Sequence, residues 1–382
     1  MRIAIDGRSI VRPDIGRVSG INQYTSCMID ALADASLTDT FVVFLDADVP
    51  GDHVKMMISG RKNIEVRQDP STLRSVPYVG VHVMLPAAIH SERVDLFFAP
   101  TGLIPLGLKV PSVAFIHDLF ILKHPEWFPD SALQQLFTLK LVLPRSVDRA
   151  RLLLTPSESV RRDVIDAFPN VKSKVSVVHE GVTLCPSSSE RKIEGRYIVS
   201  VATLEPRKNI VFALRAFEAL LSRDPSLSKS LQYVIAGMSG WGAEPILEAI
   251  EHVNARWRQY RPDGVVRYLG PVTDVERCSL YEHAELYLCT SLAEGFGLPP
   301  LEAMAVGTAV VTTAVGVIPE IARGSAAIIR ENDVPSAASV LLMLLNDSAE
   351  RSRLAAAGKG AVDHLTWRRS AEQTIALFHT VH

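Results

Sequence analysis

The sequence predicts an α/β protein made of two doubly wound domains, each with a largely parallel sheet. Three observations support this prediction. The chain has 382 residues, which is too long for one ordinary domain. Short, nearly continuous apolar runs, typical of parallel strands buried on both faces, alternate with longer amphipathic patterns. This alternation stops at the polar, turn-rich residues 185–196 and then begins again.

The apolar runs define the expected strands of both domains. In the first domain they are residues 2–6, 41–45, 94–98, 112–117, 151–155 and 174–178. In the second they are residues 197–201, 231–236, 265–269, 285–290, 309–312 and 326–329. Residues 22–33 and 159–168 are typical of amphipathic helices between such strands. We therefore place the first domain at residues 1–185, the second at 186–365 and a C-terminal helix, capped by Thr366, within 366–382.

Composition argues against several classes of protein. Forty basic residues face 42 acidic ones, whereas a nucleic-acid-binding protein would carry a basic excess. The cysteines Cys27, Cys185, Cys278 and Cys289 form no Cys-x-x-Cys pair, so we expect neither a zinc site nor a disulfide framework. No apolar run has the character of a signal peptide or the length of a membrane span. We therefore expect a cytoplasmic protein that is soluble or lies on a membrane surface.

The most informative stretch, residues 290–307, follows an expected strand. Pro299 and Pro300 suit the first turn of a helix, where a missing N–H does no harm, and Gly307 suits the helix end. The residues before them should form a loop that leads into the helix N-terminus. Backbone N–H groups and the positive end of the helix dipole attract phosphate there, and Gly295 and Gly297 allow a close approach.

Two glutamates flank this loop. Glu294 precedes it and Glu302 lies about one turn into the helix, so the two need not bind the same atom. Carboxylates accept hydrogen bonds from sugar hydroxyls, and a vicinal diol can donate two bonds to one carboxylate. A backbone-bound phosphate with hydroxyls on either side matches a nucleotide-sugar. A plain strand–turn–helix with two solvated glutamates explains the spacing equally well.

A second stretch, residues 203–210, follows the first expected strand of the second domain. It contains the adjacent cations Arg207 and Lys208. The carboxyl ends of parallel strands line the crevice in which open α/β sheets bind ligands, so this pair can neutralise a diphosphate there. A solvated basic turn is the alternative. The functional interpretation is favoured because both candidate anion sites lie in one domain.

The first domain offers two weaker candidates. His117 ends an expected strand, where it can relay a proton or hydrogen-bond a hydroxyl, although a lone histidine there is more often structural. The loop around Ser19 and Gly20 resembles a phosphate loop only weakly. The sequence has no Gly-x-Gly-x-x-Gly and no Walker lysine motif, so neither a dinucleotide fold nor a nucleoside triphosphatase is supported.

At these residues the sequence resembles the retaining glycosyltransferases of family four, which have the GT-B fold. The likeness covers nearly the whole chain. Glu294, seven intervening residues and Glu302 match the family's two-glutamate signature, and residues 204–209 are similar to its diphosphate-binding element. The residues around Arg207 look most like those of bacterial mannosyltransferases of polysaccharide assembly. The resemblance implies two facing Rossmann-like domains with a deep cleft between them, the first binding the acceptor and the second the nucleotide-sugar. It also implies a C-terminal helix that crosses back to the first domain.

The resemblance gives each candidate residue a role. Glu294 would hydrogen-bond the transferred sugar and Glu302 the ribose. Arg207 and Lys208 would stabilise the leaving diphosphate, while His117 would approach the sugar or the acceptor. The remaining donor-binding candidates are Gly20, Gly295, Phe296, Gly297 and Leu298. Ser19 departs from the family pattern, because many members have a second glycine at that position.

The resemblance also implies a reaction that keeps the anomeric configuration. No residue is an obvious nucleophile, so we expect front-face attack in which the departing diphosphate takes the acceptor's proton. This course needs no metal and no cofactor. The sequence has one Asp-x-Asp, Asp46-Ala47-Asp48, which lies outside the expected donor domain and is expected to be a solvated turn. If these roles hold, Glu302→Gln should weaken binding of free nucleoside diphosphate, and Glu294→Gln should leave it nearly unchanged.

The expected reaction is transfer of a hexose, most directly mannose from GDP-mannose, to a polysaccharide or lipid-linked glycan, as in bacterial lipopolysaccharide assembly. Residues 133–151 mix apolar and basic side chains and could lie on the inner face of the cytoplasmic membrane, but they fit a core helix equally well. Four alternatives stay open: a hexosyltransferase that uses a UDP-sugar, a nucleotide-sugar epimerase, a glycoside hydrolase and a silent nucleotide-sugar-binding protein. The cationic pair argues against the hydrolase, because a neutral glycoside would not need it.

Overall fold

The computed structural model describes residues 1–10, 20–69, 80–128, 138–185 and 191–381. Its contacts divide the chain into two compact units. Unit 1 combines Met1–Gly181 with Leu365–His382, and unit 2 is Val182–His364. Unit 2 therefore begins before the polar segment expected to link the domains. Of that segment, residues 186–190 lie outside the described part of the chain.

Unit 1 is built on a parallel seven-stranded sheet in the order β3-β2-β1-β4-β5-β6-β7. The strands are β1 (Arg2–Asp6), β2 (Thr40–Asp46), β3 (Ile64–Asp69), β4 (Leu96–Ala99), β5 (Ser112–Phe115), β6 (Leu152–Thr155) and β7 (Val175–Val177). The direction in which strands are added reverses between β1 and β4. This doubly wound order confirms the α/β fold class predicted for the first domain.

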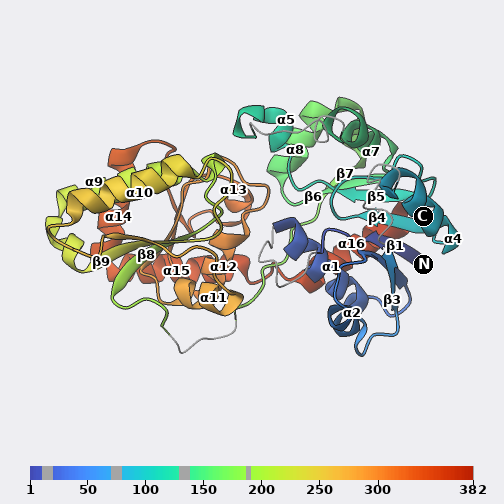
Figure 1. Cartoon of the computed structure of the whole chain (residues 1–382), viewed down its shortest axis with the longest axis horizontal. Helices are drawn as coiled ribbons and strands as arrows, with labels where there is room; N and C mark the ends of the chain where they lie inside the picture. Colours follow the sequence, from blue (N-terminus) through green and yellow to red (C-terminus); the bar gives the residue numbers. More distant parts are fainter. Residues whose placement is uncertain (11–19, 70–79, 129–137, 186–190, 382) are drawn as a thin grey trace. The chain divides into compact units, whose positions relative to one another are not determined.

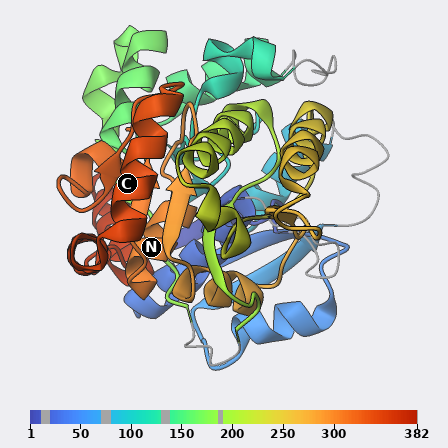
Figure 2. The same ribbon diagram turned by 90° about the vertical axis from the view of Figure 1, so that its left-hand side faces the viewer.

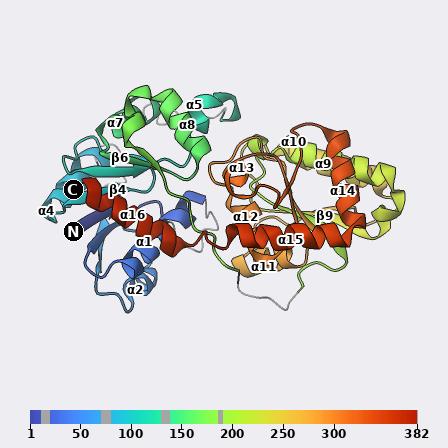
Figure 3. The same cartoon turned by 180° about the vertical axis from the view of Figure 1, so that it is seen from behind.

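Helices cover both faces of this sheet, because successive side chains of each buried strand point to opposite sides. Ile3 and Ile5 belong to a core that includes α1 (Gly20–Ala35) and α16 (Trp367–Val381). Ala4 belongs to the opposite core, with α4 (Leu85–Ser91), α7 (Leu143–Arg149) and α8 (Glu158–Ala167). The C-terminal helix α16 lies beside α1 (Figure 3), and its Phe378 is fully buried against Phe98. Unit 1 also contains the α-helices α2 (Gly51–Ile58) and α5 (Phe120–Lys123).

Unit 2 repeats this plan with a parallel six-stranded sheet in the order β10-β9-β8-β11-β12-β13. The strands are β8 (Arg196–Val201), β9 (Leu231–Ala236), β10 (Val266–Tyr268), β11 (Leu286–Cys289), β12 (Val310–Thr312) and β13 (Ala327–Ile328). The strand order reverses between β8 and β11, which are paired neighbours. An open parallel sheet binds ligands beyond the carboxyl ends of its strands at such a switch point.

The helices of unit 2 form two groups on opposite faces of its sheet (Figure 1 and Figure 2). On one face α9 (Ile210–Arg223) contacts α10 (Glu244–Trp257) and α14 (Val334–Asn346). On the other, α12 (Leu298–Val306) contacts α11 (Asp274–Glu282) and α15 (Ser348–Val362). A short helix, α13 (Ile318–Ile321), completes the unit. Each strand predicted from the apolar runs has a counterpart within two residues at either end.

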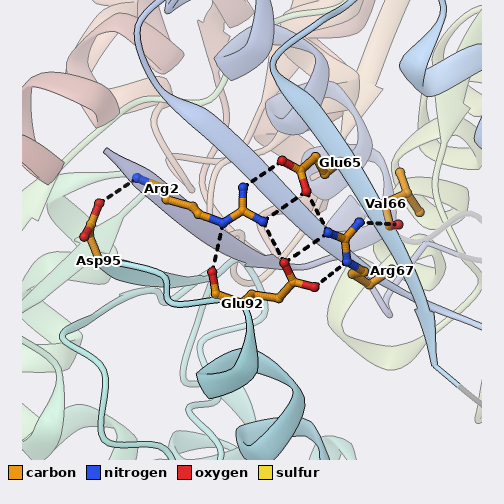
Figure 4. Close-up of polar contacts among 6 residues, drawn as sticks. All are labelled: Arg2, Glu65, Val66, Arg67, Glu92 and Asp95. Carbon is orange, nitrogen blue, oxygen red and sulfur yellow. Dashed lines mark hydrogen bonds and ion pairs between the residues drawn. The ribbon is translucent and has the colours of Figure 1, made fainter.

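Strand β3 was not predicted, because charged residues, Glu65 and Arg67, alternate with the apolar ones along it. Ile64 packs into the core of unit 1, whereas Glu65 and Arg67 take part in an ion-pair network. Arg2 donates to Glu65 over 2.7 Å and to Glu92 over 2.6 Å, and Arg67 pairs with both carboxylates (Figure 4). An edge strand with one polar side alternates in hydrophobicity, so a search for continuous apolar runs does not find it.

Cys185 and Cys278 form a disulfide within unit 2, which joins the segment after the unit boundary to α11. The expectation of unpaired cysteines is wrong for this pair. The two residues are 93 positions apart in the sequence but have Cα atoms 5.4 Å apart, a proximity that Cys spacing alone does not reveal. Cys27 and Cys289, which are both among the described residues, are not joined in a disulfide. Among the helices of the described residues, none combines the length and apolar character of a membrane span.

Candidate functional site

The candidate cations and the first candidate glutamate lie at the switch point of unit 2. Arg207 and Lys208 belong to a 3₁₀ turn, Pro206–Lys208, in the loop after β8. Glu294 lies in the loop between β11 and α12. Because β8 and β11 are parallel neighbours, the loops that follow them emerge at the same edge of the sheet. Residues 86 positions apart in the sequence are thereby brought into contact.

Backbone contacts hold these two loops together. Asn209 ends the 3₁₀ turn in the left-handed region with φ 51°, a conformation that asparagine tolerates better than most residues. The Thr290 hydroxyl donates to the carbonyls of Lys208 and Asn209 over 3.0 and 3.1 Å. The amide of Leu292 donates to the carbonyl of Arg207 over 2.8 Å. The cations are therefore placed by the backbone rather than left on a freely solvated turn.

Glu205, Arg207, Lys208 and Glu294 form one ion-pair cluster. Lys208 Nζ lies 2.6 Å from Glu294 Oε1, and Arg207 Nη1 lies 3.0 Å from Glu294 Oε2. Arg207 Nη2 lies 2.6 Å from Oε1 of Glu205, a carboxylate that is 3% exposed. Ser291 donates a further hydrogen bond of 2.6 Å to Glu294 Oε1. Two cations and two carboxylates thus balance each other in a largely buried site.

The charge state of Glu294 follows from these contacts. Burial by itself raises the pKa of the carboxyl, because the charged form loses its hydration. The charges of Lys208 and Arg207, with hydrogen bonds from Lys208 and Ser291, outweigh burial and hold the pKa of Glu294 at about 2. Glu294 is therefore an anion near neutral pH, and it can accept hydrogen bonds but not donate a proton.

The loop of residues 295–297 leads from Glu294 into α12, which begins at Leu298, one residue earlier than the prolines predicted. Gly297 has φ 93° at the N-cap of this helix, a conformation that favours glycine. The Phe296 carbonyl accepts a hydrogen bond of 3.0 Å from the Val317 amide, and a Cβ on Gly316 would lie only 2.3 Å from that carbonyl oxygen. The prolines that follow Leu298 carry no N–H. Amide donors for a phosphate therefore belong to this loop more than to the first helical turn.

Glu302 lies in a separate pocket of side chains on the buried side of α12, where it is 2% exposed. Tyr281 donates to Glu302 Oε2 over 3.0 Å, and Arg277 Nε lies 3.4 Å from the same oxygen. Burial raises the pKa of the nearby Tyr287 hydroxyl of β11 well above its usual value. Its ring packs edge-on against that of Tyr281, with the centroids 5.6 Å apart. Sequence analysis missed Arg277 and Tyr281, whose four-residue spacing on one helix face is not a recognisable motif.

His117 follows β5 in unit 1, and an oxygen acceptor lies near each of its ring nitrogens. Nδ1 lies 3.2 Å from Glu180 Oε1, and Nε2 lies 2.9 Å from the carbonyl oxygen of Pro100. Tyr24 packs edge-on against the ring with the centroids 4.8 Å apart. The carbonyl oxygen of Pro100 can only accept, so Nε2 is the donor in that hydrogen bond. The sequence left a proton relay, a hydrogen bond to a hydroxyl and a structural role open for His117.

The other candidates of unit 1 are less constrained. Gly20 is the first residue of α1 and is exposed, and a Cβ there would meet nothing within 4 Å. Its neighbour Ser19 lies outside the described residues, as do residues 133–137 of the segment considered for membrane contact. Leu143 and Val147 of that segment are buried in the core of unit 1. In the described part of the chain, no three His, Cys, Asp or Glu side chains gather to hold a metal ion.

Two family models match the chain. The model described as glycosyl transferases group 1 matches residues 186–361, which contain the ion-pair cluster and Glu302. The model described as Glycosyltransferase Family 4 matches residues 18–184, which contain His117. The chain belongs to the family-four glycosyltransferases. The expectation of a transferase with the GT-B fold is thereby confirmed.

The names of relatives of this glycosyltransferase refer to more than one class of acceptor. The O-antigen chain mannosyltransferase B of Escherichia coli is 28% identical over 299 residues, which are 75% of each chain. The D-inositol 3-phosphate glycosyltransferase of Salinispora tropica is 27% identical over 400 residues, covering 96% of this chain and 82% of the relative. The named relatives agree on glycosyl transfer and differ in what they glycosylate.

Solved structures similar to this glycosyltransferase share its fold. A sucrose-phosphate synthase from Thermosynechococcus elongatus aligns with a TM-score of 0.73 at 18% identity, covering 100% of this chain and 98% of that one. The Anabaena protein HepE, solved in complex with UDP and glucose, aligns with a TM-score of 0.72 at 17% identity, covering 100% and 99%. At this identity the likeness establishes the two-domain fold alone.

Proposed function

We propose that this glycosyltransferase moves a hexose, with retention of configuration, from a nucleotide-sugar bound by unit 2 to a glycan acceptor. The observation that carries the proposal is the position of the ion-pair cluster. Arg207 and Lys208 lie beyond the carboxyl ends of β8 and β11, with Glu294 in contact with both. A diphosphate at this point would meet two cations and the amides of residues 295–298, which is what a departing anion requires.

The residues then have distinct tasks during transfer. As the bond between the sugar and the diphosphate breaks, negative charge grows on the diphosphate, and Arg207 and Lys208 stabilise it. Glu302 accepts hydrogen bonds from the ribose, and Glu294 accepts them from the sugar ring as it gains positive charge. His117 lies close to the sugar or the acceptor in this proposal. The acceptor oxygen attacks from the face that the diphosphate leaves, and its proton passes to a diphosphate oxygen, so no protein nucleophile and no metal is needed.

The donor we propose is GDP-mannose, and the acceptor a polysaccharide or lipid-linked glycan. The support is the resemblance around Arg207 and two Escherichia coli relatives, the O-antigen chain mannosyltransferase B and the mannosyltransferase WbdA. A lipid-linked acceptor would bring the enzyme to the inner face of the cytoplasmic membrane. An inositol phosphate acceptor and a UDP-sugar donor are the competing assignments, motivated by the Salinispora relative and by HepE.

A panel of nucleotide-sugars tests the donor. A ligand that binds only the folded protein raises its melting temperature, so GDP-mannose should give a larger shift than UDP-glucose or other donors. Incubation with a glycan acceptor should then yield a mannosylated product by mass spectrometry, and the Lys208→Ala variant serves as the control with impaired transfer. A larger shift with a UDP-sugar would reassign the donor. Isomerisation of the donor without acceptor would indicate an epimerase, and binding without any turnover a silent binding protein.

Membrane contact needs a separate measurement. If the acceptor is lipid-linked, the purified protein should sediment with anionic liposomes, and salt should weaken this binding because charged surfaces are screened. Protein that ignores such liposomes and uses only water-soluble acceptors would contradict the lipid-linked assignment. The proposed donor site would be unaffected by that result.

A further inference from the structure

In the structure, the carboxylate of Glu294 already occupies the two cations that are proposed to hold the donor's diphosphate. Its two oxygens are divided between them, with Oε1 at 2.6 Å from Lys208 Nζ and Oε2 at 3.0 Å from Arg207 Nη1. Arg207 also donates to the carbonyl of Ala293 over 2.8 Å and to Glu205 over 2.6 Å. A phosphate oxygen that approached these cations would therefore compete with Glu294 for their protons.

Charge makes this competition unavoidable. The cluster holds two cations and two carboxylates, so it is neutral before any ligand arrives. A diphosphate adds at least two negative charges, and like charges in a partly desolvated site repel strongly. Lys208 and Glu294 have side chains that are only 12% and 11% exposed, so solvent screens this repulsion poorly. Binding of diphosphate thus sets the phosphates against Glu294 in a contest for the same two positive charges, and we expect at least one cation to turn from the carboxylate toward the phosphates.

The consequence depends on what the displaced carboxylate meets next. A buried carboxylate that loses its partners is costly unless other donors replace them. A bound nucleotide-sugar brings hydroxyl donors that can satisfy Glu294. A nucleoside diphosphate brings the same phosphates without those hydroxyls. The two ligands therefore differ in whether the displacement of Glu294 is compensated.

We propose that Glu294 is an internal anion that competes with the diphosphate for Arg207 and Lys208, and so favours the nucleotide-sugar over the nucleoside diphosphate. This inference rests on the proposed function. After transfer, the sugar hydroxyls have left, so the carboxylate returns to its cations and weakens the hold on the product. Release of product limits turnover in many enzymes, and Glu294 would speed that step.

This role changes the expectation drawn from the sequence, in which Glu294→Gln left the affinity for nucleoside diphosphate nearly unchanged. A glutamine has no charge to set against the phosphates and leaves both cations available to them. Calorimetric titration should therefore show that GDP or UDP, whichever binds the wild type, binds Glu294→Gln at least about tenfold more tightly. Inorganic pyrophosphate should gain affinity as well, because it reports on the cations without any base or sugar. The intact nucleotide-sugar should gain much less.

Glu205→Gln is the matched control. It removes one negative charge from the same cluster but leaves Lys208 paired with Glu294, so the affinity for nucleoside diphosphate should rise far less than in Glu294→Gln. Equal gains in the two variants would mean that net charge alone sets the affinity, which overturns the proposal. Glu294→Ala provides a second variant in case Glu294→Gln folds poorly. Thermal melting curves identify which variants are folded.

The wild type supplies an independent readout. Competition by Glu294 requires that the nucleotide-sugar bind the wild type at least as tightly as the nucleoside diphosphate does. Weaker binding of the nucleotide-sugar, or unchanged affinity for nucleoside diphosphate in a folded Glu294 variant, overturns this inference and leaves the proposed function standing. If the wild type binds neither nucleoside diphosphates nor nucleotide-sugars, the proposed function itself fails, and the inference fails with it.

Discussion

Loss of Arg207 should destabilise unit 2 because it leaves Glu205 buried without its counter-ion. The Glu205 carboxylate is 3% exposed and lies 2.6 Å from Arg207 Nη2. Arg207→Met removes that partner, whereas Glu294 keeps Lys208 and Ser291. The variant also removes the hydrogen bonds from Arg207 to the carbonyl of Ala293 and to Glu294. The effect of the unpaired Glu205 carboxylate is therefore measured by the recovery that Glu205→Gln gives in the double variant.

The expected cost is large. Removing one partner of a buried ion pair destabilises a protein by about 3–5 kcal/mol, since the remaining charge can no longer be compensated. In a domain of this size each kcal/mol lowers the melting temperature by about 2–4 °C. Arg207→Met should therefore melt on the order of 10 °C below the wild type. Adding Glu205→Gln removes the unpaired charge, so the double variant should recover much of that loss while its turnover stays low.

Thermal melts of the wild type, both single variants and the double variant form a double-mutant cycle that measures this coupling. Arg256→Met is the control, because Arg256 is 65% exposed and pairs with Glu218 over 3.2 Å. Its loss should cost less than about 1 kcal/mol, as for other surface ion pairs. The reasoning is refuted if Arg207→Met melts with the wild type, or if Glu205→Gln gives no recovery in the double variant.

Four further outcomes are expected. Lys208→Ala should lower turnover about a hundredfold, because it removes a cation that meets growing charge in the transition state; single-turnover rates near those of the wild type would contradict this. Glu302→Gln should mainly raise the apparent Michaelis constant for the donor, and a pure loss of kcat would assign the residue elsewhere. The hydrogen bond from Arg2 outweighs burial and holds the pKa of Glu65 at about 2, below its usual 4.5. The ionised Glu65 therefore stabilises the fold above pH 4.5, and this stabilisation is lost as pH falls toward 2. The difference in free energy of unfolding between the wild type and Glu65→Gln should become smaller over that pH range. A difference that does not change with pH would exclude this effect of Glu65. Cys185→Ser should lower the free energy of unfolding by about 2–4 kcal/mol in non-reducing buffer, because it removes the disulfide with Cys278. Cys27→Ser is the control and should leave the free energy of unfolding unchanged. If the two variants are equally stable, the disulfide has no structural role.

The fold could be predicted where burial dictates the sequence pattern. Strand β6 (Leu152–Thr155) lies inside the sheet of unit 1 with helices on both faces, so each of its residues is buried and the apolar run is continuous. Strand β3 lies at the edge, where Ile64 is buried and Val66 is partly buried, and the charged residues Glu65 and Arg67 interrupt the apolar pattern. A search for continuous apolar runs therefore misses a strand in which charged residues alternate with apolar ones.

The site was predictable in its members but not in their pairing. Arg207, Lys208 and Glu294 were each identified from local sequence, because strand ends and helix starts leave local signals. That Glu294 holds both cations, and that Glu205 holds Arg207, depends on two loops meeting across the sheet edge. No local pattern encodes such a contact, just as none paired Cys185 with Cys278. The candidate residues were thus identified from local sequence and from the family resemblance, whereas their balance of charge required the structure.

The place of α16 in unit 1 has a consequence for how the chain folds as it is synthesised. Ala371 and Phe378 are fully buried in the core that covers β1 and α1, although they are made after the whole of unit 2. Unit 2 is one uninterrupted stretch and has all its strands before α16 leaves the ribosome. Domains usually fold in the order of their synthesis. Here the second unit can finish first, whereas the core of the first unit that contains α1 stays incomplete until α16 has been made.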